Sequence, residues 1–282
     1  LVGQMDYSKL PNKEIINGKE VFSCVLPNNF NFLGYSKHYK EGIKDPNAVV
    51  NIKNGKLITG IMDKANLGEG QGLLLRNLHK KYGPAEAMDI LGKIYRLGVL
   101  TLSNYGFTTG ISDIDLPKEA NDNINKILET ADEEVKKLIK KYHNNELDAF
   151  PGRTIAETLE LKILETLNKA RNDSGRIVQN HIKEESGMNL MIASGARGSS
   201  LNLAQMAGCV GQQALRGKRI ERGYHNRTLS CFKEEDLSPK ARGFIKNSFS
   251  KGLEPHEFFF MSMTGRDSLM DTGLRTPKSG YL

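Results

Sequence analysis

The stretch Thr154-Ile-Ala-Glu-Thr-Leu-Glu-Leu-Lys-Ile-Leu-Glu-Thr-Leu-Asn-Lys-Ala170 decides the fold of the middle of this chain. Thr154 and Glu157 have the spacing of a capping box, in which each side chain accepts a hydrogen bond from the other residue's backbone N–H. Apolar side chains then recur at helical spacing, at Ile155, Leu159, Ile163, Leu167 and Ala170. The pattern predicts a long amphipathic helix that runs to about Glu185.

A second helical pattern precedes this one. It starts near Pro117, and its apolar positions are Ile124, Ile127, Leu128, Val135, Leu138, Ile139 and Tyr142. Charged residues fill the other face, and the pattern breaks at residues 144–152. Two long amphipathic helices joined by a short loop form an antiparallel hairpin. Because such a hairpin has little apolar area of its own, we expect it to project from, or lean against, a larger body.

The first hundred residues alternate between strand and helix signals. Glu20–Leu26 predicts a short strand that ends at Pro27. Residues 49–53 and 56–61 flank Asn54-Gly55, a dipeptide that suits the positive φ angles of a type I′ turn, so they predict a β-hairpin. Helices are expected over residues 73–82 and, with Pro84 in the first helical position, from there to Gly106.

The segment from Arg197 to Arg227 is basic and rich in glycine. It holds six basic residues and one acidic residue, a net charge of +5 in 31 residues. Guanidinium groups beside glycines suit phosphate oxygens, which accept paired hydrogen bonds. A solvated basic surface explains the same composition, and the residues alone leave the two readings equally open. Leu201–Leu215 predicts a helix between two glycine-rich loops.

The C-terminal segment predicts a long helix with built-in weak points. Pro255 suits the first helical position, and apolar residues follow at helical spacing. Four residues weaken the interior: Gly265, Gly273, Pro277 and Gly280. Together they cost about 6 kcal/mol relative to alanine. The ring of Pro277 is expected to collide with the carbonyl of Gly273. Either the helix stops near Thr276, or surrounding protein holds it straight and it can bend. The chain as a whole is predicted to be α+β and rich in helix, with a mixed small-sheet region.

Composition excludes several classes of protein. The chain has 282 residues, 38% of them hydrophobic, which is not the composition of a disordered protein. The formal net charge of +7 permits an acidic partner. No run of 18 apolar residues exists, so no membrane segment is predicted. The N-terminus lacks the pattern of a signal peptide and an initiator Met, which indicates a piece of a longer chain. Three scattered cysteines fit a reducing cytoplasm.

Common enzyme motifs fit poorly. Gly68-x-Gly-x-Gly72 lacks the spacing of a dinucleotide loop. Gly211-(x)5-Gly217-Lys-Arg has one residue too many for a phosphate loop and no Ser or Thr after the lysine. Asp113-x-Asp115 could bind a metal but is more typical of a helix start, by about four to one. The six histidines show no pairing typical of a zinc hydrolase. Cys209 is expected to be a small packed residue.

A set of short motifs over the last ninety residues is far more specific. The motifs are Ser194-Gly-Ala-Arg-Gly-Ser199, Asn202-Leu-Ala-Gln-Met206, Cys209-Val-Gly-Gln-Gln213, Gly217-Lys-Arg-Ile220, Arg242-Gly-Phe-Ile-Lys-Asn-Ser248, Gly252-Leu-x-Pro-x-Glu-Phe-Phe-Phe260, Gly265-Arg-Asp-x-Leu-x-Asp-Thr272 and Ser279-Gly-Tyr281. In this order they resemble the largest subunit of multisubunit DNA-directed RNA polymerases, in its archaeal A-prime form. Gly60, Asp63-Lys64, Gly106-Phe107 and Gly110-Ile-Ser-Asp113 extend the resemblance upstream.

The resemblance implies four regions. Residues 1–112 are similar to the pore region, and residues 113–190 to the funnel, a helical hairpin beside the secondary channel. Residues 191–253 are similar to the wall beside the active site. Residues 254–282 resemble the start of the bridge helix, which crosses the cleft between template and catalytic centre. A helix with weak points is what a bending translocation element would need.

The resemblance also implies a reaction and its participants. The whole enzyme would make RNA from NTPs with two Mg²⁺ ions. Arg197 would contact the incoming NTP. Thr276 and Pro277 would face the template base, with Tyr281 near the downstream template, and the nucleic-acid contacts also include Arg275 and Lys278. The three-aspartate metal motif of the family is absent, so no metal ligand is expected in this chain, and the chain alone should be inactive.

The expected partners are those of a polymerase subunit: the second-largest subunit, the remainder of the largest subunit, template DNA, RNA, NTPs, and cleavage and elongation factors that reach the funnel. No membrane partner is expected. The alternative hypothesis is a stand-alone, non-enzymatic basic module that binds nucleic acid or protein. It would use the same arginines for phosphate contacts, with the helical hairpin as a docking arm.

Overall fold

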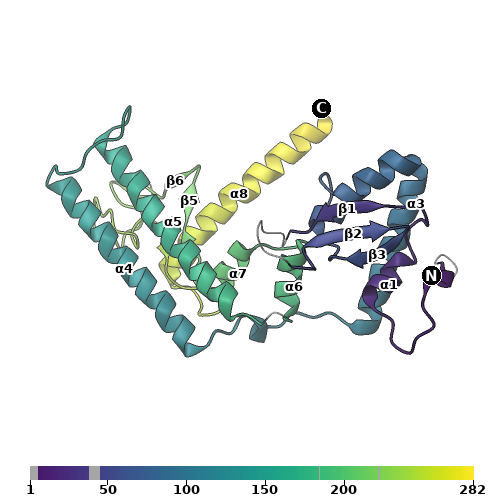
Figure 1. The fold of residues 1–282 in the computed structure, drawn as a ribbon. Coiled ribbons are helices and arrows are strands. Elements are labelled where there is room, and N and C mark those ends of the chain that lie inside the picture. The colour runs from purple at the N-terminus through teal and green to yellow at the C-terminus, as the bar shows by residue number, and fades with distance from the viewer. Residues whose placement is uncertain (1–5, 38–44, 184, 222) are drawn as a thin grey trace. The chain divides into compact units, whose positions relative to one another are not determined.

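The computed structural model describes residues 6–37, 45–183, 185–221 and 223–282. The chain divides into two compact units. Unit 1 comprises Leu1–Thr109 and Glu184–Gly198, and unit 2 comprises Gly110–Lys183 and Ser199–Leu282. Figure 1 shows the elements of both. The expected α+β, helix-rich class is confirmed. None of the helices in the described ranges has the length and apolar content needed to cross a bilayer.

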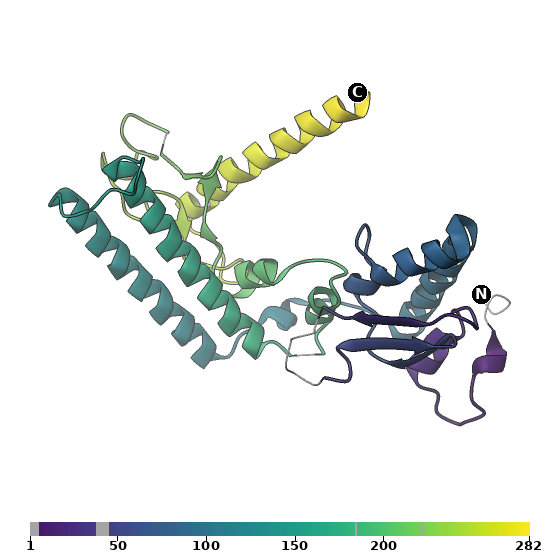
Figure 2. The same cartoon turned by 45° about the horizontal axis from the view of Figure 1, so that its top comes forward.

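Unit 1 is a small sheet with helices. Its elements are the 3₁₀ turn η2 (Tyr7–Lys9), α1 (Gly18–Ser23), β1 (Phe32–Tyr35), β2 (Val49–Lys53), β3 (Lys56–Thr59), α2 (Lys64–Leu67), α3 (Leu73–Tyr105) and α6 (Gly187–Ser194). The strands form an antiparallel sheet in the order β1-β2-β3. The predicted hairpin is confirmed, with Asn54 at φ 48° and Gly55 at φ 70°. Figure 2 shows α3 beside the sheet, and the core between them is apolar, with Val50, Ile52 and Leu74 fully buried.

The predicted strand over Glu20–Leu26 is wrong, because the chain forms helix α1 there. Asn17 and Glu20 make a capping box: the Asn17 side chain accepts from the Lys19 backbone N–H at 3.2 Å, and the Glu20 carboxylate accepts from the Asn17 N–H at 2.9 Å. This local bonding outweighs the strand preference of the following residues. The break within α3 is confirmed, since Gly83 has a non-helical φ of 81° and Pro84 follows it.

Unit 2 contains the long helices. Its elements are the 3₁₀ turn η3 (Ile111–Ile114), α4 (Lys118–His143), α5 (Ile155–His181), α7 (Ser200–Ala207), β4 (Gly211–Gln212), β5 (Ala214–Leu215), β6 (Lys218–Arg219), β7 (Phe244–Ile245) and α8 (Pro255–Tyr281). The short strands pair antiparallel, β4 with β7 and β5 with β6.

The antiparallel helical hairpin is confirmed, and it is formed by α4 and α5 (Figure 1). Their apolar stripes face one another, and Ile124, Val135 and Ile163 are fully buried. The capping box at Thr154 is confirmed. The Thr154 hydroxyl accepts from the Glu157 N–H at 3.2 Å, and the Glu157 carboxylate accepts from the Thr154 N–H at 3.0 Å. Helix α5 ends at His181 rather than near Glu185, because the next residue takes up an extended conformation.

The predicted helix Leu201–Leu215 is only half correct. Helix α7 ends at Ala207, and the following residues turn into β4 and β5. The backbone of residues 210–213 finds partners far along the chain: the Val210 N–H donates to the Asn247 carbonyl at 3.0 Å, and the Gln213 N–H donates to the Gly243 carbonyl at 2.8 Å. These pairings replace the helical bonds. Cys209 is packed as expected, with no exposed surface.

Helix α8 begins at Pro255, as predicted, and continues through Pro277 to Tyr281. Of the two alternatives, a stop near Thr276 is wrong. Pro277 has no N–H to donate to the Gly273 carbonyl four residues earlier. The Ser279 hydroxyl lies 2.8 Å from the Arg275 carbonyl and 3.2 Å from the Thr276 carbonyl, and neither of these is the acceptor that the proline deprives of its donor. From Ser268 onward every residue is exposed, so no described part of the chain packs around this half of the helix. Figure 2 shows α8 extending away from the other elements of unit 2.

Candidate nucleic-acid interface

The loop that carries Arg197 in unit 1 is shaped by backbone bonds. Helix α6 ends at Gly195, which takes the left-handed conformation with φ 75° and donates to the Ile192 carbonyl at 3.2 Å. The Ala196 and Arg197 N–H groups then both donate to the Met191 carbonyl, at 3.1 and 3.4 Å. A Cβ at Gly195 would lie 2.9 Å from the Lys64 Cβ, so the turn requires glycine. The turn holds the Arg197 backbone in place, and its side chain is exposed.

The other five predicted contact residues lie within the last two turns of α8 in unit 2. Arg275, Thr276, Pro277, Lys278 and Tyr281 are all exposed. The Arg275 Nε lies 2.7 Å from the Asp271 Oδ1 one turn earlier, in an ion pair that solvent screens. Tyr281 is 91% exposed, so its ring is free to stack. Thus α8 brings five of the six predicted site residues together, while Arg197 belongs to the other unit.

The base of α8 is anchored by a buried carboxylate that the sequence analysis did not single out. Glu257 is 5% exposed. Its Oε2 accepts from the Glu254 N–H and from the Asn247 side-chain amide, both at 2.9 Å, and its Oε1 accepts from the Lys246 N–H at 3.2 Å. Phe260, 1% exposed, stacks on Phe232 with ring centroids 6.2 Å apart. The Glu254-x-x-Glu257 spacing, which resembles a capping box, was the available signal.

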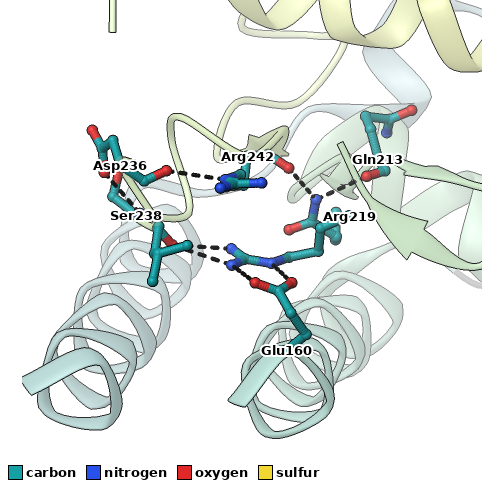
Figure 3. Close-up of polar contacts among 8 residues, drawn as sticks. Glu160, Gln213, Arg219, Asp236, Ser238 and Arg242 are labelled. Atoms are coloured by element: carbon teal, nitrogen blue, oxygen red, sulfur yellow. Dashed lines mark hydrogen bonds and ion pairs between the residues drawn. The ribbon is translucent and has the colours of Figure 1, made fainter. Parts of the chain in front are cut away.

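A buried ion pair joins the helical hairpin to the basic segment (Figure 3). The Arg219 guanidinium, fully buried, donates to both carboxylate oxygens of Glu160 at 2.7 and 2.8 Å. It also donates twice to the Leu237 carbonyl at 3.2 Å. On the same side, the Gln212 side-chain amide donates to the Arg242 carbonyl at 2.8 Å. This network ties α5 to β6 and to the loop that leads to β7.

The basic segment therefore divides by role. Arg197, Arg216 and Lys218 are exposed, as either sequence reading allows. Arg219 contradicts both interpretations, the phosphate-binding site and the solvated basic surface. Its guanidinium is buried and forms an ion pair with Glu160. Arg227 is half-buried, and Arg222 lies outside the described residues.

The described residues offer no group of three or more His, Cys, Asp and Glu side chains that could hold a metal ion. Asp113 uses its carboxylate locally, accepting from the Gly110 N–H at 3.0 Å. Burial raises the pKa of the Cys209 thiol to about 12, so this cysteine is neutral and inert. Among the described residues Mg²⁺ would therefore find no fitting set of ligands.

Comparisons of the sequence with known proteins place the chain in a family. Models of RNA polymerase Rpb1 domains 3, 4 and 5 match residues 8–114, 138–245 and 252–282 in succession. The DNA-directed RNA polymerase subunit Rpo1N of Halococcus morrhuae is 45% identical over 233 residues, covering 83% of this chain and 67% of that relative. The chain belongs to the RNA polymerase Rpb1 family.

Other relatives support the archaeal resemblance. Rpo1N of Methanothermobacter thermautotrophicus is 42% identical and that of Methanocaldococcus jannaschii is 40% identical, covering 94% and 95% of this chain. The chain spans 31% and 20% of their lengths, so it matches about a third or less of each. Membership in the Rpb1 family favours a portion of a polymerase subunit over a stand-alone module. The division into pore, funnel, wall and bridge helix remains a prediction.

Proposed function

We propose that this chain is a portion of the largest subunit of a DNA-directed RNA polymerase, which makes RNA from NTPs on a DNA template. The observation that carries the proposal is the ordered match to three successive Rpb1 domains, together with 45% identity to the Rpo1N subunit of Halococcus morrhuae. Two features of the chain give the proposal its chemistry, namely the Arg197 loop and the exposed end of α8.

Arg197 would hold the triphosphate of the incoming nucleotide. Its guanidinium presents paired N–H donors whose geometry matches phosphate oxygens. The turn at Gly195 and the bonds to the Met191 carbonyl fix the backbone from which the side chain reaches out. A fixed backbone reduces the ordering cost when the phosphate is bound.

The exposed end of α8 would contact the template strand. Arg275 and Lys278 are three positions apart and so lie on neighbouring parts of the helix surface, where they would meet backbone phosphates. Thr276 and Pro277 present short side chains, which allow a base to approach the helix closely. The Tyr281 ring would stack on a base or sugar of the downstream template.

The catalytic metal ions would be held elsewhere in the polymerase. Two Mg²⁺ ions in such an enzyme stabilise the attacking and leaving oxygens. The role of this chain is to bind and orient the substrates. Its partners would be the rest of the largest subunit, the second-largest subunit, DNA, RNA and factors that reach the α4–α5 hairpin. Because the similar proteins come from archaea, whose cells have no nucleus, the polymerase would transcribe DNA in the cytoplasm.

The test uses the assembled polymerase carrying Arg197→Ala. Removing a charge-assisted contact to phosphate, which contributes about 1.5–3 kcal/mol, should raise the apparent KM for NTPs roughly tenfold or more. Single-nucleotide addition measured over a range of NTP concentrations gives KM and the maximal rate. The matched control is Arg96→Ala, an exposed arginine on α3 in the same unit, which should behave as wild type. Equal KM values for the two variants would remove Arg197 from the site.

A further inference from the structure

We propose that Glu257 is a positioning residue that sets the direction of α8 and, through it, the register of the template. This inference rests on the proposed function, because it needs the end of α8 to contact the template. Glu257 itself is remote from that end and does not touch a substrate. It acts through the helix that it anchors.

The argument begins with burial. Glu257 is 5% exposed, whereas every residue of the same helix from Ser268 onward is exposed. A buried carboxylate is costly unless hydrogen bonds satisfy it. Here three donors do so: the N–H groups of Glu254 and Lys246 and the side-chain amide of Asn247. All three approach one side chain, so the carboxylate joins the first turn of α8 to the segment at residues 246–247.

That segment is itself held firmly. It directly follows β7, whose residues Phe244 and Ile245 pair with β4. The Asn247 carbonyl accepts from the Val210 N–H at 3.0 Å, and the Lys246 ammonium lies 3.7 Å from the Asp132 carboxylate of α4. Glu257 therefore fixes α8 against the β4–β7 pair, and the pair is connected to the helical hairpin.

The length of α8 amplifies any change at this anchor. Pro277 lies twenty residues beyond Glu257, which is about 30 Å along a helix that rises about 1.5 Å per residue. A tilt of about 6–7° at the base would move the far end by about 3.4 Å, the spacing of successive bases along one strand. Within the described part of this chain nothing packs on the outer half of α8, so among these residues the direction at the base sets where the end lies.

Loss of the Glu257 anchor should therefore let the template occupy more than one register, without removing any substrate contact. If only about a third of complexes hold the template correctly, the apparent KM for the next NTP rises about threefold, because apparent affinity scales with the competent fraction. The maximal rate at saturating NTP should change less, since NTP binding selects the correct register.

The experiment compares assembled elongation complexes that carry wild type, Glu257→Ala, Glu257→Gln and Asn247→Ala. Single-nucleotide addition gives KM and maximal rate, and exonuclease footprinting gives the position of the enzyme on DNA. Glu257→Ala should raise KM at least threefold and broaden the footprint edge over two registers. Glu257→Gln keeps an acceptor oxygen, so its KM and footprint should lie between those of wild type and Glu257→Ala. The control is Glu165→Gln, an exposed acid on α5.

Asn247→Ala removes one of the three donors, so its effect should be smaller and in the same direction. It also keeps the inference testable if Glu257→Ala does not assemble. Normal KM and a sharp footprint in an active Glu257→Ala enzyme, or in Asn247→Ala if only that enzyme assembles, would overturn the inference alone. A loss of active enzyme with unchanged KM would reduce Glu257 to a structural role. Absence of templated synthesis by the wild-type complex would instead overturn the proposed function.

Discussion

At the scale of single residues, buried charged side chains join elements that are distant in the described sequence. Arg219 and Glu160 join a β-hairpin to a helix, and Glu257 joins α8 to the segment after β7. Several hydrogen bonds satisfy the polar atoms of Arg219 and of Glu257 inside the protein. If one partner is removed, the other charged group stays buried without a compensating partner, and the folded state is destabilised.

Glu160→Gln should destabilise unit 2. The substitution removes the charge opposite Arg219, which is fully buried. Removing one partner of a buried pair costs 3–5 kcal/mol, and the lower end, about 3 kcal/mol, is expected here because the Glu160 side chain is 25% exposed. Urea unfolding followed by circular dichroism measures the loss. Glu165→Gln, on the exposed side of the same helix, should change stability by less than about 0.5 kcal/mol. Equal midpoints for the two variants would contradict the fastening role.

Cys209 should resist alkylation. Burial raises its pKa from 9.0 to about 12, so at pH 8 its thiolate fraction is about a thousandfold lower than in the unfolded chain. The raised pKa means that this thiol favours the folded state fully below pH 9, and the contribution is lost as the pH rises from about 9 to 12. Iodoacetamide labelling read by mass spectrometry should modify the exposed Cys231 and spare Cys209 until the protein unfolds. Comparable labelling of both thiols at pH 8 would contradict this.

The fastening residues show what the sequence could not reveal. Arg219 belongs to a basic, glycine-rich segment, and that composition indicates a surface that meets phosphate. Its partner Glu160 lies 59 positions upstream, beyond the reach of any local pattern. Arg197 has no such partner signal either, and only the family motif around it predicts a role, which stays a prediction. Motifs therefore predict site residues, whereas buried partners such as Glu160 require the fold.

At the scale of elements, local signals decided most boundaries. The Thr154 capping box, the Asn54-Gly55 turn and Pro255 all act where the sequence places them. The error after α7 came where other pairings overrode the local preference for helix: residues 210–213 pair with backbone at residues 243–247, and residues 214–215 pair with residues 218–219. The α1 error was different, because the Asn17 and Glu20 capping box was present in the sequence and was not recognised.

Thr154→Ala should weaken the start of α5. The Thr154 hydroxyl accepts from the Glu157 N–H at 3.2 Å, and loss of an N-cap hydroxyl costs about 1 kcal/mol. Hydrogen exchange of the first-turn amides of α5 measures the change. Thr130→Ala is the matched control, since this exposed threonine lies within α4, where its hydroxyl bonds only to the Lys126 carbonyl. If both variants leave exchange unchanged, the cap does not stabilise the helix.

At the scale of the whole molecule, the described chain divides into two compact units. The Arg197 loop belongs to unit 1, and the end of α8 belongs to unit 2. The family was predictable from the motifs and the helix-rich class from the helical patterns, because each of these signals lies within a short segment of sequence. Under the proposed function, partners of this chain, among them nucleic acid, would contact the exposed half of α8.

The most direct measurement is a photo-crosslink from the template in the assembled polymerase. A 4-thiothymidine placed at the template position that pairs with the incoming NTP is irradiated in a stalled elongation complex, and the adduct is mapped by mass spectrometry. Our account predicts that the template base crosslinks to a residue within the range 275–281. An enzyme that makes RNA normally, yet forms its adduct nowhere on α8, would contradict the placement of this helix at the template.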